Sequence, residues 1–327
     1  MVPFAYAVAP SVQAAMARVA LTPNAEFIAG GTDMLQLLQE GVRAPEEIID
    51  LNGLPLTDIE VSPNGVRIGA LARMAQVADD PRIHEQFPVV TQALLASASP
   101  QVRNMATIGG NLLQRTRCLY YRDVATPCNK RDPGSGCSAL DGENRMSAVL
   151  GGSSQCIAAY PGDLAVALLV VDAEAQIAGL NGQHTMPIEK LHRTPGETPH
   201  IETNLQAGEI ITAVLIPISG YAKRSCYLKL RDRASFEWAV ASAAVALEME
   251  DGKIRQARVA VGGVATKPWR LHQVEQILIG EKFQADLIRR AASLAAAGAE
   301  PRKRNAFKVE LLKRVVERAL RTVGGET

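Results

Sequence analysis

The pattern of apolar and polar residues in the first half of the chain predicts short strands that alternate with helices. Residues 25–29 are expected to form a buried strand, the glycine pair Gly30 and Gly31 turns the chain, and an amphipathic helix follows. We expect Thr32 to cap this helix and Gly41 to end it. The other elements expected here are a helix capped by Ser11 that runs to residue 20, strands at 47–51 and 66–70, and helices at 73–79 and 83–97.

Neither the helical period nor the strand period of apolar residues continues between residues 114 and 156. This segment contains several prolines and glycines and shows neither a helical stripe nor the alternation of a strand. A structureless loop of about 40 residues is uncommon inside a compact domain unless something other than a hydrophobic core organises it. The segment, called the cysteine loop below, holds four of the five cysteines of the chain: Cys118, Cys128, Cys137 and Cys156.

The pattern changes again near Ser219 and Gly220, where long strands followed by long helices replace the short elements. Before this point we expect a helix at 162–170 and strands at 174–177, 183–188 and 209–217; after it we expect strands at 224–230, 236–249 and 254–264 and helices at 269–279, 283–297 and 305–323. Residues 239–247 are rich in alanine, but the hairpin signal of Asp251 and Gly252 favours a strand over a helix. The sequence therefore predicts two domains, residues 1–219 and 220–327.

The charge of the chain is balanced, with 35 lysines and arginines against 34 aspartates and glutamates among 327 residues. This balance leaves no overall field to attract nucleic acid or an anionic membrane. The longest apolar run, residues 164–171, is too short to span a bilayer. The first residues have no basic segment of a secretory signal, so we expect any export to depend on a signal-bearing partner.

The cysteine loop has the composition of a metal or cluster site. Its thiols are spaced C-x9-C-x8-C-x18-C, and thiolates that converge from a glycine-rich segment suit soft metals and cubane iron–sulfur clusters. Between residues 101 and 131, cations that would offset the negative charge of a cluster outnumber the single acid Asp123. These cations are Arg103, Arg115, Arg117, Arg122, Lys130 and Arg131. Because the spacing matches no zinc ribbon or ferredoxin, the pattern alone leaves zinc, disulfides and inert thiols open.

Two glycine pairs are candidate ligand-binding turns. The first lies in residues 29–33, between a strand and a helix, and the second in residues 107–111, directly before the cysteine loop. Backbone N–H groups in such turns bind phosphate oxygens, and the side chains of Thr107 and Asn111 can add hydrogen bonds. Either turn alone is more often structural, but two of them indicate a large cofactor with a diphosphate. Neither has the G-x-G-x-x-G spacing of a classical NAD site.

Other polar side chains have ordinary structural interpretations. Taken alone, Asp163 is a helix-start acid and Lys229 a solvated strand lysine. Cys226 stands apart from the loop and is expected to be a small buried side chain. None of the histidines lies at ligand spacing from a cysteine; they are His84, His184, His192, His200 and His272.

Four motifs together resemble the FAD-binding subunits of the xanthine dehydrogenase and aldehyde oxidase family of molybdenum hydroxylases. They are Ala-Gly-Gly-Thr-Asp at 29–33, Ala-Thr-Ile-Gly-Gly-Asn at 106–111, Pro-Gly-Asp-Leu at 161–164 and Lys-x-Arg-x-Arg at 229–233. The resemblance extends over essentially the whole chain. The cysteine loop is similar to an insertion in the flavin subunit of bacterial three-subunit aldehyde oxidoreductases, which holds a [4Fe–4S] cluster. A related insertion in 4-hydroxybenzoyl-CoA reductase means that the loop alone does not fix the substrate.

The resemblance implies an α+β fold. Its first part is a two-lobed FAD-binding domain of the vanillyl-alcohol-oxidase (PCMH) type with the iron–sulfur loop inserted at 114–156, and its second part is an antiparallel sheet covered by helices. The four loop cysteines would ligate the cluster, and no residue of this chain would be catalytic. Carried over by motif, the residues that bind FAD are Glu26, Phe27, Ile28, Ala29, Gly30, Gly31, Thr32, Asp33, Met34, Thr107, Gly109, Gly110, Asn111, Asp163, Ile211 and Lys229. Lys229 would lie near the isoalloxazine ring, where a cation stabilises the anionic reduced form.

The resemblance also implies an electron-transfer subunit, since nothing in the chain is similar to a molybdopterin site. Oxidation of an aldehyde to an acid would occur in a large molybdopterin subunit, and electrons would pass through the [2Fe–2S] centres of a small subunit to FAD here and then to an external acceptor. We expect a heterotrimer, periplasmic by co-export or cytoplasmic. The alternatives are the flavin subunit of a 4-hydroxybenzoyl-CoA reductase-like or other molybdenum hydroxylase and, from another class, a zinc-stabilised structural subunit without flavin.

Overall fold

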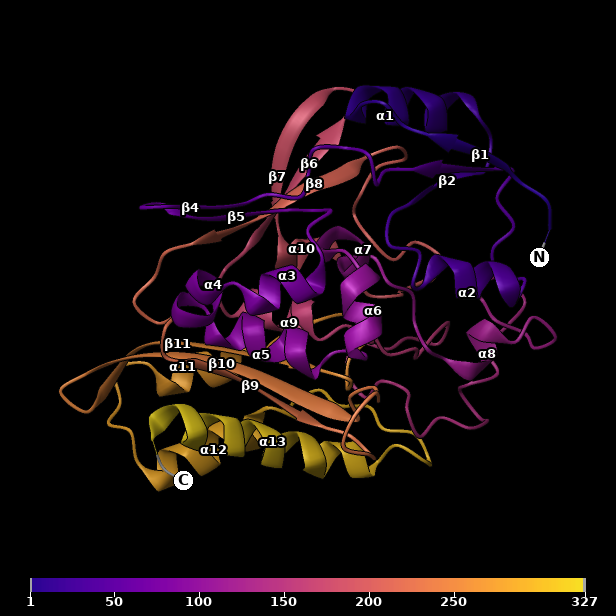
Figure 1. The fold of residues 1–327 in the computed structure, drawn as a ribbon. Coiled ribbons are helices and arrows are strands. Elements are labelled where there is room, and N and C mark those ends of the chain that lie inside the picture. The colour runs from indigo at the N-terminus through magenta and orange to yellow at the C-terminus, as the bar shows by residue number, and fades with distance from the viewer. Residues whose placement is uncertain (1, 326–327) are drawn as a thin grey trace.

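The N-terminal lobe is a small parallel sheet packed against one helix. The computed structural model describes residues 2–325. In spatial order the strands of this sheet are β1 (Ala5–Val8), β3 (Glu47–Asp50) and β2 (Ala25–Ile28). Helix α1 (Val12–Leu21) lies beside the sheet at the top of Figure 1. Ser11 caps this helix, as the sequence predicts, by accepting a hydrogen bond from the Ala14 N–H at 3.1 Å.

A second sheet, of five antiparallel strands, joins residues from both sides of the cysteine loop. In spatial order its strands are β4 (Ile59–Ser62), β5 (Gly65–Gly69), β8 (Ile210–Pro217), β6 (Glu174–Gly179) and β7 (Gly182–Pro187). The central pairing sets Gly69 opposite Ala213, so β8 returns from far along the chain to lie beside β5. The segments before and after the cysteine loop therefore form one folded unit.

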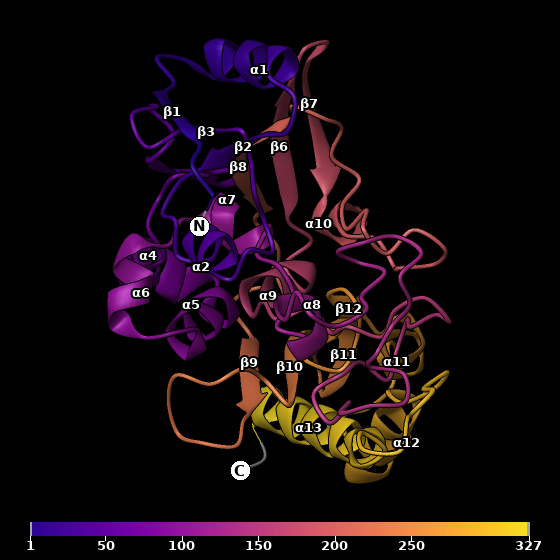
Figure 2. The ribbon, with the colours of Figure 1, turned by 90° about the vertical axis from the view of Figure 1, so that its right-hand side faces the viewer.

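The last third of the chain is an antiparallel sheet covered by helices. In spatial order its strands are β12 (Trp269–Arg270), β11 (Lys253–Gly262), β10 (Ala241–Glu250) and β9 (Ser225–Leu230), and its helices are α11 (His272–Leu278), α12 (Ala285–Leu294) and α13 (Phe307–Gly324). Asp251 and Gly252, with φ angles of 51° and 73°, close the β10–β11 hairpin that the sequence predicts. Figures 1 and 2 show α12 and α13 on the face of the sheet that is turned away from the rest of the molecule.

Short helices fill the space between the two larger sheets and extend to the cysteine loop (Figure 1). In chain order they are α2 (Met34–Gln39), α3 (Met74–Asp79), α4 (Pro81–Gln86), α5 (Pro88–Ala96), α6 (Pro100–Met105), α7 (Ile108–Leu112), α8 (Leu119–Arg122), α9 (Leu164–Leu169) and α10 (Ile188–Leu191). Helix α5 packs against β9, and α9 packs against β10 and β11. One glycine pair lies just before α2, and the other lies inside α7.

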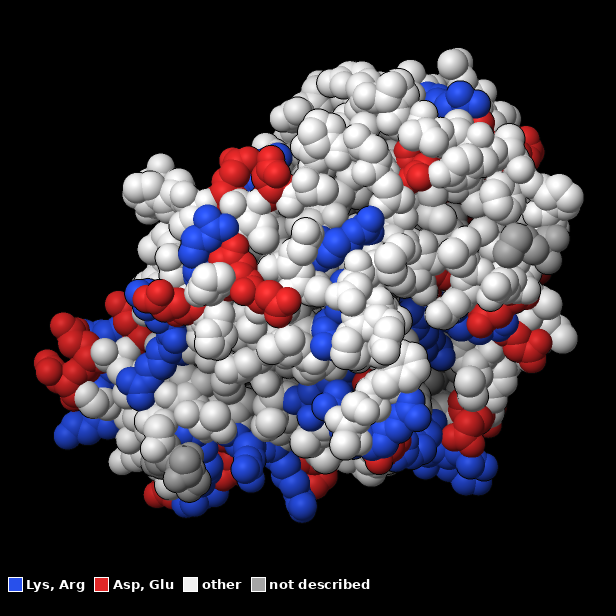
Figure 3. Space-filling model, in the orientation of Figure 1, with Lys and Arg blue, Asp and Glu red and all other residues white. Residues whose placement is uncertain are grey.

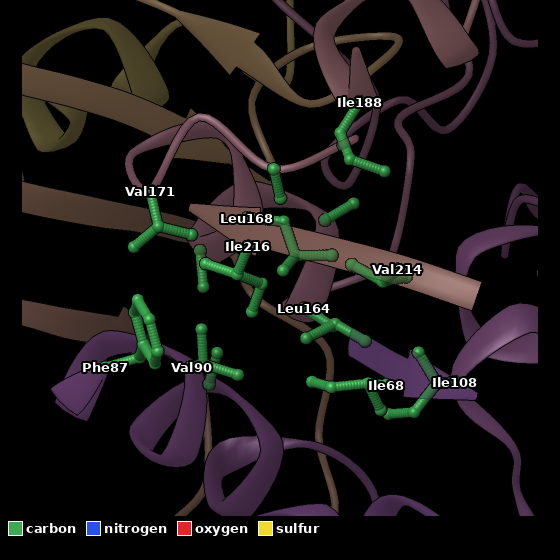
Figure 4. Close-up of a cluster of buried hydrophobic side chains, with 14 of the residues drawn as sticks. Ile68, Phe87, Val90, Ile108, Leu164, Leu168, Val171, Ile188, Val214 and Ile216 are labelled. Atoms are coloured by element: carbon green, nitrogen blue, oxygen red, sulfur yellow. The ribbon is translucent and has the colours of Figure 1, made fainter. Parts of the chain in front are cut away.

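The main hydrophobic core lies between the five-stranded sheet and these helices, and Figure 4 shows its centre. Ile68 of β5 and Val214 of β8 face Leu164 and Leu168 of α9, and all four side chains are at most 2% exposed. Phe87, directly before α5, is fully buried in the same core. This core fixes α9 and α7 against the sheet and so positions the residues at their starts.

Strand β10 is buried on both faces. Ala244 and Ala246 belong to the main core, whereas Val245 and Leu247 pack in a second core with α11, α12 and α13. Small side chains let the C-terminal sheet approach the helix layer closely. Burial on both faces also explains why this strand has an alanine-rich, nearly continuous apolar sequence instead of an alternating one.

Three expected features differ from the structure for local reasons. The helix predicted at 83–97 is two helices, because Pro88 lacks the N–H that a continuous helix needs and instead starts α5 at its first position. The helix predicted at 269–279 begins as strand β12 and becomes helical only at His272. Thr32 does not cap α2, since Asp33 occupies the cap position and its side chain makes no capping bond.

Charged side chains of both signs are intermixed on the surface in Figure 3. On that face they gather in the lower half, whereas the N-terminal lobe is mostly uncharged. The mixture agrees with the near-neutral net charge of the chain. Within residues 2–325, no helix combines the length and the apolar character that crossing a membrane would require.

Candidate cofactor site

The two glycine pairs lie side by side in the structure. Gly30 has no room for a side chain, because a Cβ there would be 2.0 Å from the carbonyl oxygen of Met105, two residues before Thr107. Gly109 is also closely packed, since its Cβ would lie 3.0 Å from the Cβ of Ala70. The fold therefore brings the two predicted turns together, and their contact requires glycine at position 30.

Both turns hold polar atoms without partners. Among the described residues, nothing accepts a hydrogen bond from the backbone N–H groups of residues 30–33. In the second turn, Thr107 caps α7 by accepting from the Gly110 N–H, but the buried Oδ1 of Asn111 has no hydrogen-bond partner. Buried polar atoms are nearly always paired in folded proteins. Free N–H groups beside a glycine turn suit an anion with several oxygens, such as the diphosphate of FAD.

The side chain of Asp33 is bound to the cysteine loop. Its Oδ2 accepts a hydrogen bond from the Arg115 N–H at 2.7 Å, and its Oδ1 accepts one from the Arg122 guanidinium at 2.7 Å. Arg117 donates to the same Oδ1. Only the backbone of this predicted FAD residue therefore remains available to a ligand.

Asp163, at the start of α9, and Lys229 of β9 form a buried ion pair. The Lys229 Nζ donates to the Asp163 carboxylate at 2.8 Å and to the carbonyl oxygen of Ala96 at 3.1 Å, and both charged side chains are only 3% exposed. The hydroxyls of Ser97 and Tyr227 donate to the same carboxylate at 2.8 and 2.5 Å. Burial, together with the charge of Asp163, raises the pKa of Tyr227 well above its usual range, so it stays a donor. Lys229 is therefore not a solvated strand lysine.

Lys229→Met is expected to destabilise the chain strongly, because it leaves the buried Asp163 carboxylate without its cation. Breaking one partner of a buried pair typically costs about 3–5 kcal/mol. Lys223→Met, which replaces an exposed lysine before the same strand, is the matched control and should change stability by less than about 0.5 kcal/mol. Urea unfolding followed by circular dichroism measures both. Equal unfolding midpoints for the two variants would show that the pair contributes nothing in solution.

The cysteines of the loop form one group of free thiols. The backbones of Cys128 and Cys137 make an isolated antiparallel bridge. Burial raises the pKa of Cys118, and the nearby Cys128 and Cys137 raise it further. Burial also raises the pKa of Cys156 to about 12, with Cys137 and Cys118 adding to the rise. These effects place Cys118 near Cys128 and Cys137, and Cys156 near Cys137 and Cys118. Bound metal would be needed to hold the thiols of Cys118 and Cys156 as thiolates.

Within residues 2–325, no three His, Cys, Asp or Glu side chains are placed to hold one ion. The thiolates of a cubane cluster bind separate irons, so they stand further apart than the ligands of a single zinc ion. The Cys156 Sγ accepts a hydrogen bond from the Ala158 N–H at 3.4 Å, and bonds of this kind stabilise cluster sulfurs.

The cations of the loop are neutralised mainly by acids from other segments. The pairs are Arg115 and Lys130 with Glu202, and Arg117 and Arg122 with Asp33. Part of the basic excess is therefore used in these ion pairs, so the excess by itself does not indicate a cluster. Lys130 still acts on a thiol, because its charge opposes the rise that burial causes in the pKa of Cys156.

A cavity of about 540 Å³ separates the cysteine loop from residues 192–205. Cys156 and Lys130 line it, together with the buried His192, whose Nε2 lies 2.8 Å from the carbonyl oxygen of Leu112. Burial lowers the pKa of His192 to about 4, so its ring is neutral at pH 7. None of the predicted FAD residues, all of which the structure describes, lines this cavity. It is therefore separate from the predicted flavin site.

The other predicted FAD residues surround the first turn or lie in the sheets. Glu26 of β2 accepts a hydrogen bond from Arg43 at 2.7 Å. Phe27 packs in the small core of the N-terminal lobe, and Ile211 of β8 is buried in the main core. Ile28, Ala29 and Met34 flank the turn at the end of β2 and the start of α2.

Several residues that complete the site were not predicted. Tyr227 lies two positions before Lys229 on β9, so the period of a strand places both side chains on one face, and this spacing could have identified it. Ser97 reaches Asp163 from the end of α5, 66 residues away in sequence, and no local pattern indicates such a contact. The contacts of Arg117 and Arg122 with Asp33 are equally remote in sequence.

Two protein-family models match the chain. The model described as the FAD-binding domain in molybdopterin dehydrogenase matches residues 2–219. The model described as the CO dehydrogenase flavoprotein C-terminal domain matches residues 226–323. The two matches together extend over nearly the whole sequence.

Individual proteins are similar over the same length. The aldehyde oxidoreductase FAD-binding subunit PaoB of Escherichia coli (strain K12) is 44% identical over 301 residues, which are 91% of this chain and 91% of that protein. The glyceraldehyde dehydrogenase medium chain of Sulfolobus acidocaldarius is 27% identical over 91% of this chain and 89% of its own. A chain of carbon monoxide dehydrogenase from Hydrogenophaga pseudoflava superposes with a TM-score of 0.77 at 25% identity, covering 100% of this chain and 99% of that one. These matches confirm the α+β fold that the motifs imply.

Proposed function

Because the chain belongs to the family of FAD-binding subunits of xanthine dehydrogenase and CO dehydrogenase, we propose that it is the flavin subunit of a molybdenum-dependent aldehyde oxidoreductase. The observation that carries this substrate class is the 44% identity to an aldehyde oxidoreductase subunit over 91% of both chains. The chain is then an oxidoreductase subunit that transfers electrons, and it leaves the oxidation of the aldehyde to a partner.

The residues of the two turns would hold the diphosphate of FAD. The free N–H groups of residues 30–33 donate to phosphate oxygens, and the unpaired Oδ1 of Asn111 accepts from a hydroxyl or amide of the cofactor. Lys229, a residue that the family resemblance assigns to FAD, is held in place by Asp163 and by the carbonyl oxygen of Ala96. When bound, FAD supplies the exchange between one-electron and two-electron chemistry that a chain of iron–sulfur donors needs.

The second cofactor in this proposal is a [4Fe–4S] cluster held by Cys118, Cys128, Cys137 and Cys156. The supporting observations are the grouping of four free thiols in one loop and the backbone donor at Cys156. Near its first two cysteines the loop contributes to a small core, which consists of the buried Leu37, Tyr121 and Cys128, whereas its Val149 and Leu150 pack in the core of the C-terminal domain. A cluster would thus supply the cross-links that this segment lacks.

The proposed complex contains a small [2Fe–2S] subunit and a large molybdopterin subunit, and it passes electrons from this chain to an external acceptor. The names of the relatives support an assembly, since they describe a subunit and a medium chain. We propose that the complex works in the periplasm or in the cytoplasm.

One purification from the native host, with a tag on this chain and conditions that preserve complexes, tests the proposal. We expect two partner subunits to co-purify, intact FAD to be released on denaturation, and iron and sulfide to exceed what the small subunit holds. The isolated chain should oxidise no aldehyde. Recovery of FMN, a colourless protein with full zinc occupancy, or aldehyde oxidation by this chain alone would each contradict the proposal.

A further inference from the structure

The first glycine turn and the cysteine loop are joined at Asp33. Both oxygens of this carboxylate are used by the loop: Oδ2 by the Arg115 N–H, and Oδ1 by the guanidinium groups of Arg117 and Arg122. Asp33 directly follows the free N–H groups of the turn, and Arg117 directly precedes the first cysteine of the loop. The Asp33 side chain thus connects the residues that would hold the two cofactors.

This connection is largely shielded from water. The side chains of Asp33, Arg117 and Arg122 are 17%, 19% and 13% exposed. A carboxylate at such a position is costly without its cations, so movement of the loop would force Asp33 to move toward solvent or to lose its charge. Either change would shift the turn that presents the N–H groups.

A second contact links the same two segments. Leu37 of α2, the helix that begins at the turn, packs in a small core with Tyr121 and Cys128 of the loop. The guanidinium of Arg117 also lies 4.4 Å above the ring of Trp238, in the connection between β9 and β10. The loop therefore contacts the turn through the ion pairs of Asp33 and contacts the following helix through the apolar packing of Leu37.

We propose that occupancy of the cysteine site and binding of FAD are thermodynamically coupled through Asp33 and its loop arginines. This inference rests on the proposed function for the identity of the two cofactors. A filled cysteine site orders the loop, the loop holds Asp33 in place, and Asp33 fixes the N–H groups that receive the diphosphate. Linkage makes the effect reciprocal, so bound FAD in turn stabilises the cluster. Arg117 and Asp33 are positioning residues in this scheme.

The test measures FAD affinity with and without iron in the purified complex. Iron is removed with a chelator under reducing conditions, and the FAD dissociation constant is obtained from flavin fluorescence. We expect iron removal to weaken FAD binding about tenfold, within the usual range of coupling between sites. In Arg117→Met, binding should already be weak with iron present, and iron removal should change it by less than about twofold.

The matched control is Arg145→Met. Arg145 lies in the same loop, but it pairs with Asp232 at the surface and does not contact the turn. This variant should keep the about tenfold effect of iron. Equal FAD affinity with and without iron in the unmodified protein would overturn the coupling. An effect of iron removal on FAD affinity that is as large in Arg117→Met as in the unmodified protein would also overturn it. If the protein holds FAD and iron but iron removal does not change its FAD affinity, the coupling is wrong and the proposed function stands. If the protein holds neither FAD nor iron, both the coupling and the proposed function are wrong.

Hydrogen exchange gives a measurement that needs no iron removal. With cofactors bound, the amides of residues 30–33 should exchange faster in Arg117→Met than in Arg145→Met, because only the first variant releases Asp33. Equal exchange at these amides in the two variants would also overturn the proposal.

Discussion

Serine in place of any one thiol of the cysteine loop is expected to abolish the iron–sulfur cluster. The four variants are Cys118→Ser, Cys128→Ser, Cys137→Ser and Cys156→Ser. A missing thiolate would leave one iron open to water or to a weaker oxygen ligand, and the core near the first two cysteines is small. We expect the loss of most cluster iron in every variant, together with the loss of its visible absorbance.

Cys226→Ser is the control for this series. Its thiol is buried in β9 against α13, with the Sγ 3.6 Å from the carbonyl oxygen of Ala319, in the core of the C-terminal domain. This variant should therefore keep its iron. Iron and acid-labile sulfide, measured per chain, are compared between Cys226→Ser and the four loop variants. Iron loss in Cys226→Ser, or full iron in any of the four loop variants, would show that the ligand set is wrong.

Gly30→Ala is expected to empty the flavin site. The added methyl group would lie 2.0 Å from the carbonyl oxygen of Met105, and neither backbone can give way without moving a turn. Since Met105 leads directly into the second glycine turn, the clash separates the two sets of groups that would hold the diphosphate. Overpacking of this kind also costs about 1–3 kcal/mol of stability. We expect most of the bound FAD to be lost.

Gly53→Ala is the matched control, because a Cβ there would have its nearest neighbour at 3.9 Å, which is ordinary van der Waals contact. The flavin released per chain on denaturation, measured by absorbance, compares the two variants. If Gly30→Ala retains as much FAD as Gly53→Ala, the diphosphate is not held at this turn.

The elements that the sequence predicts well are those with their own local signals. Ser11 marks the start of α1, and the Asp251 and Gly252 pair marks the β10–β11 hairpin, because capping and turn chemistry act within a few residues. Strands β1 and β4, with four residues each, carry too few residues to show a period. Strand β1 pairs with the distant β3, whereas β4 pairs with the next strand, β5. The strand predicted from residue 236 begins only at Ala241, where pairing with β9 begins.

In the candidate site, too, features with a local sequence signal could be predicted, and contacts between distant residues could not. The glycine turns are visible in the sequence because a close backbone approach requires glycine. The contacts of the Asp33 side chain cannot be predicted from the sequence, because its partners Arg117 and Arg122 lie more than 80 residues away along the chain. An excess of arginine in a loop indicates that acids must be near, but only the fold decides which acids these are.

The pairing of β5 with β8 determines when this protein can complete its folding during synthesis. The two strands are brought together from positions 144 residues apart, Gly69 and Ala213, with the whole cysteine loop between them. As the chain leaves the ribosome, β5 therefore has an unpaired edge until residue 217 has emerged. Closing so long a loop is a slow step with a high entropic cost. The thiols of the cysteine loop emerge before β8, so they stay outside a completed domain until this pairing forms.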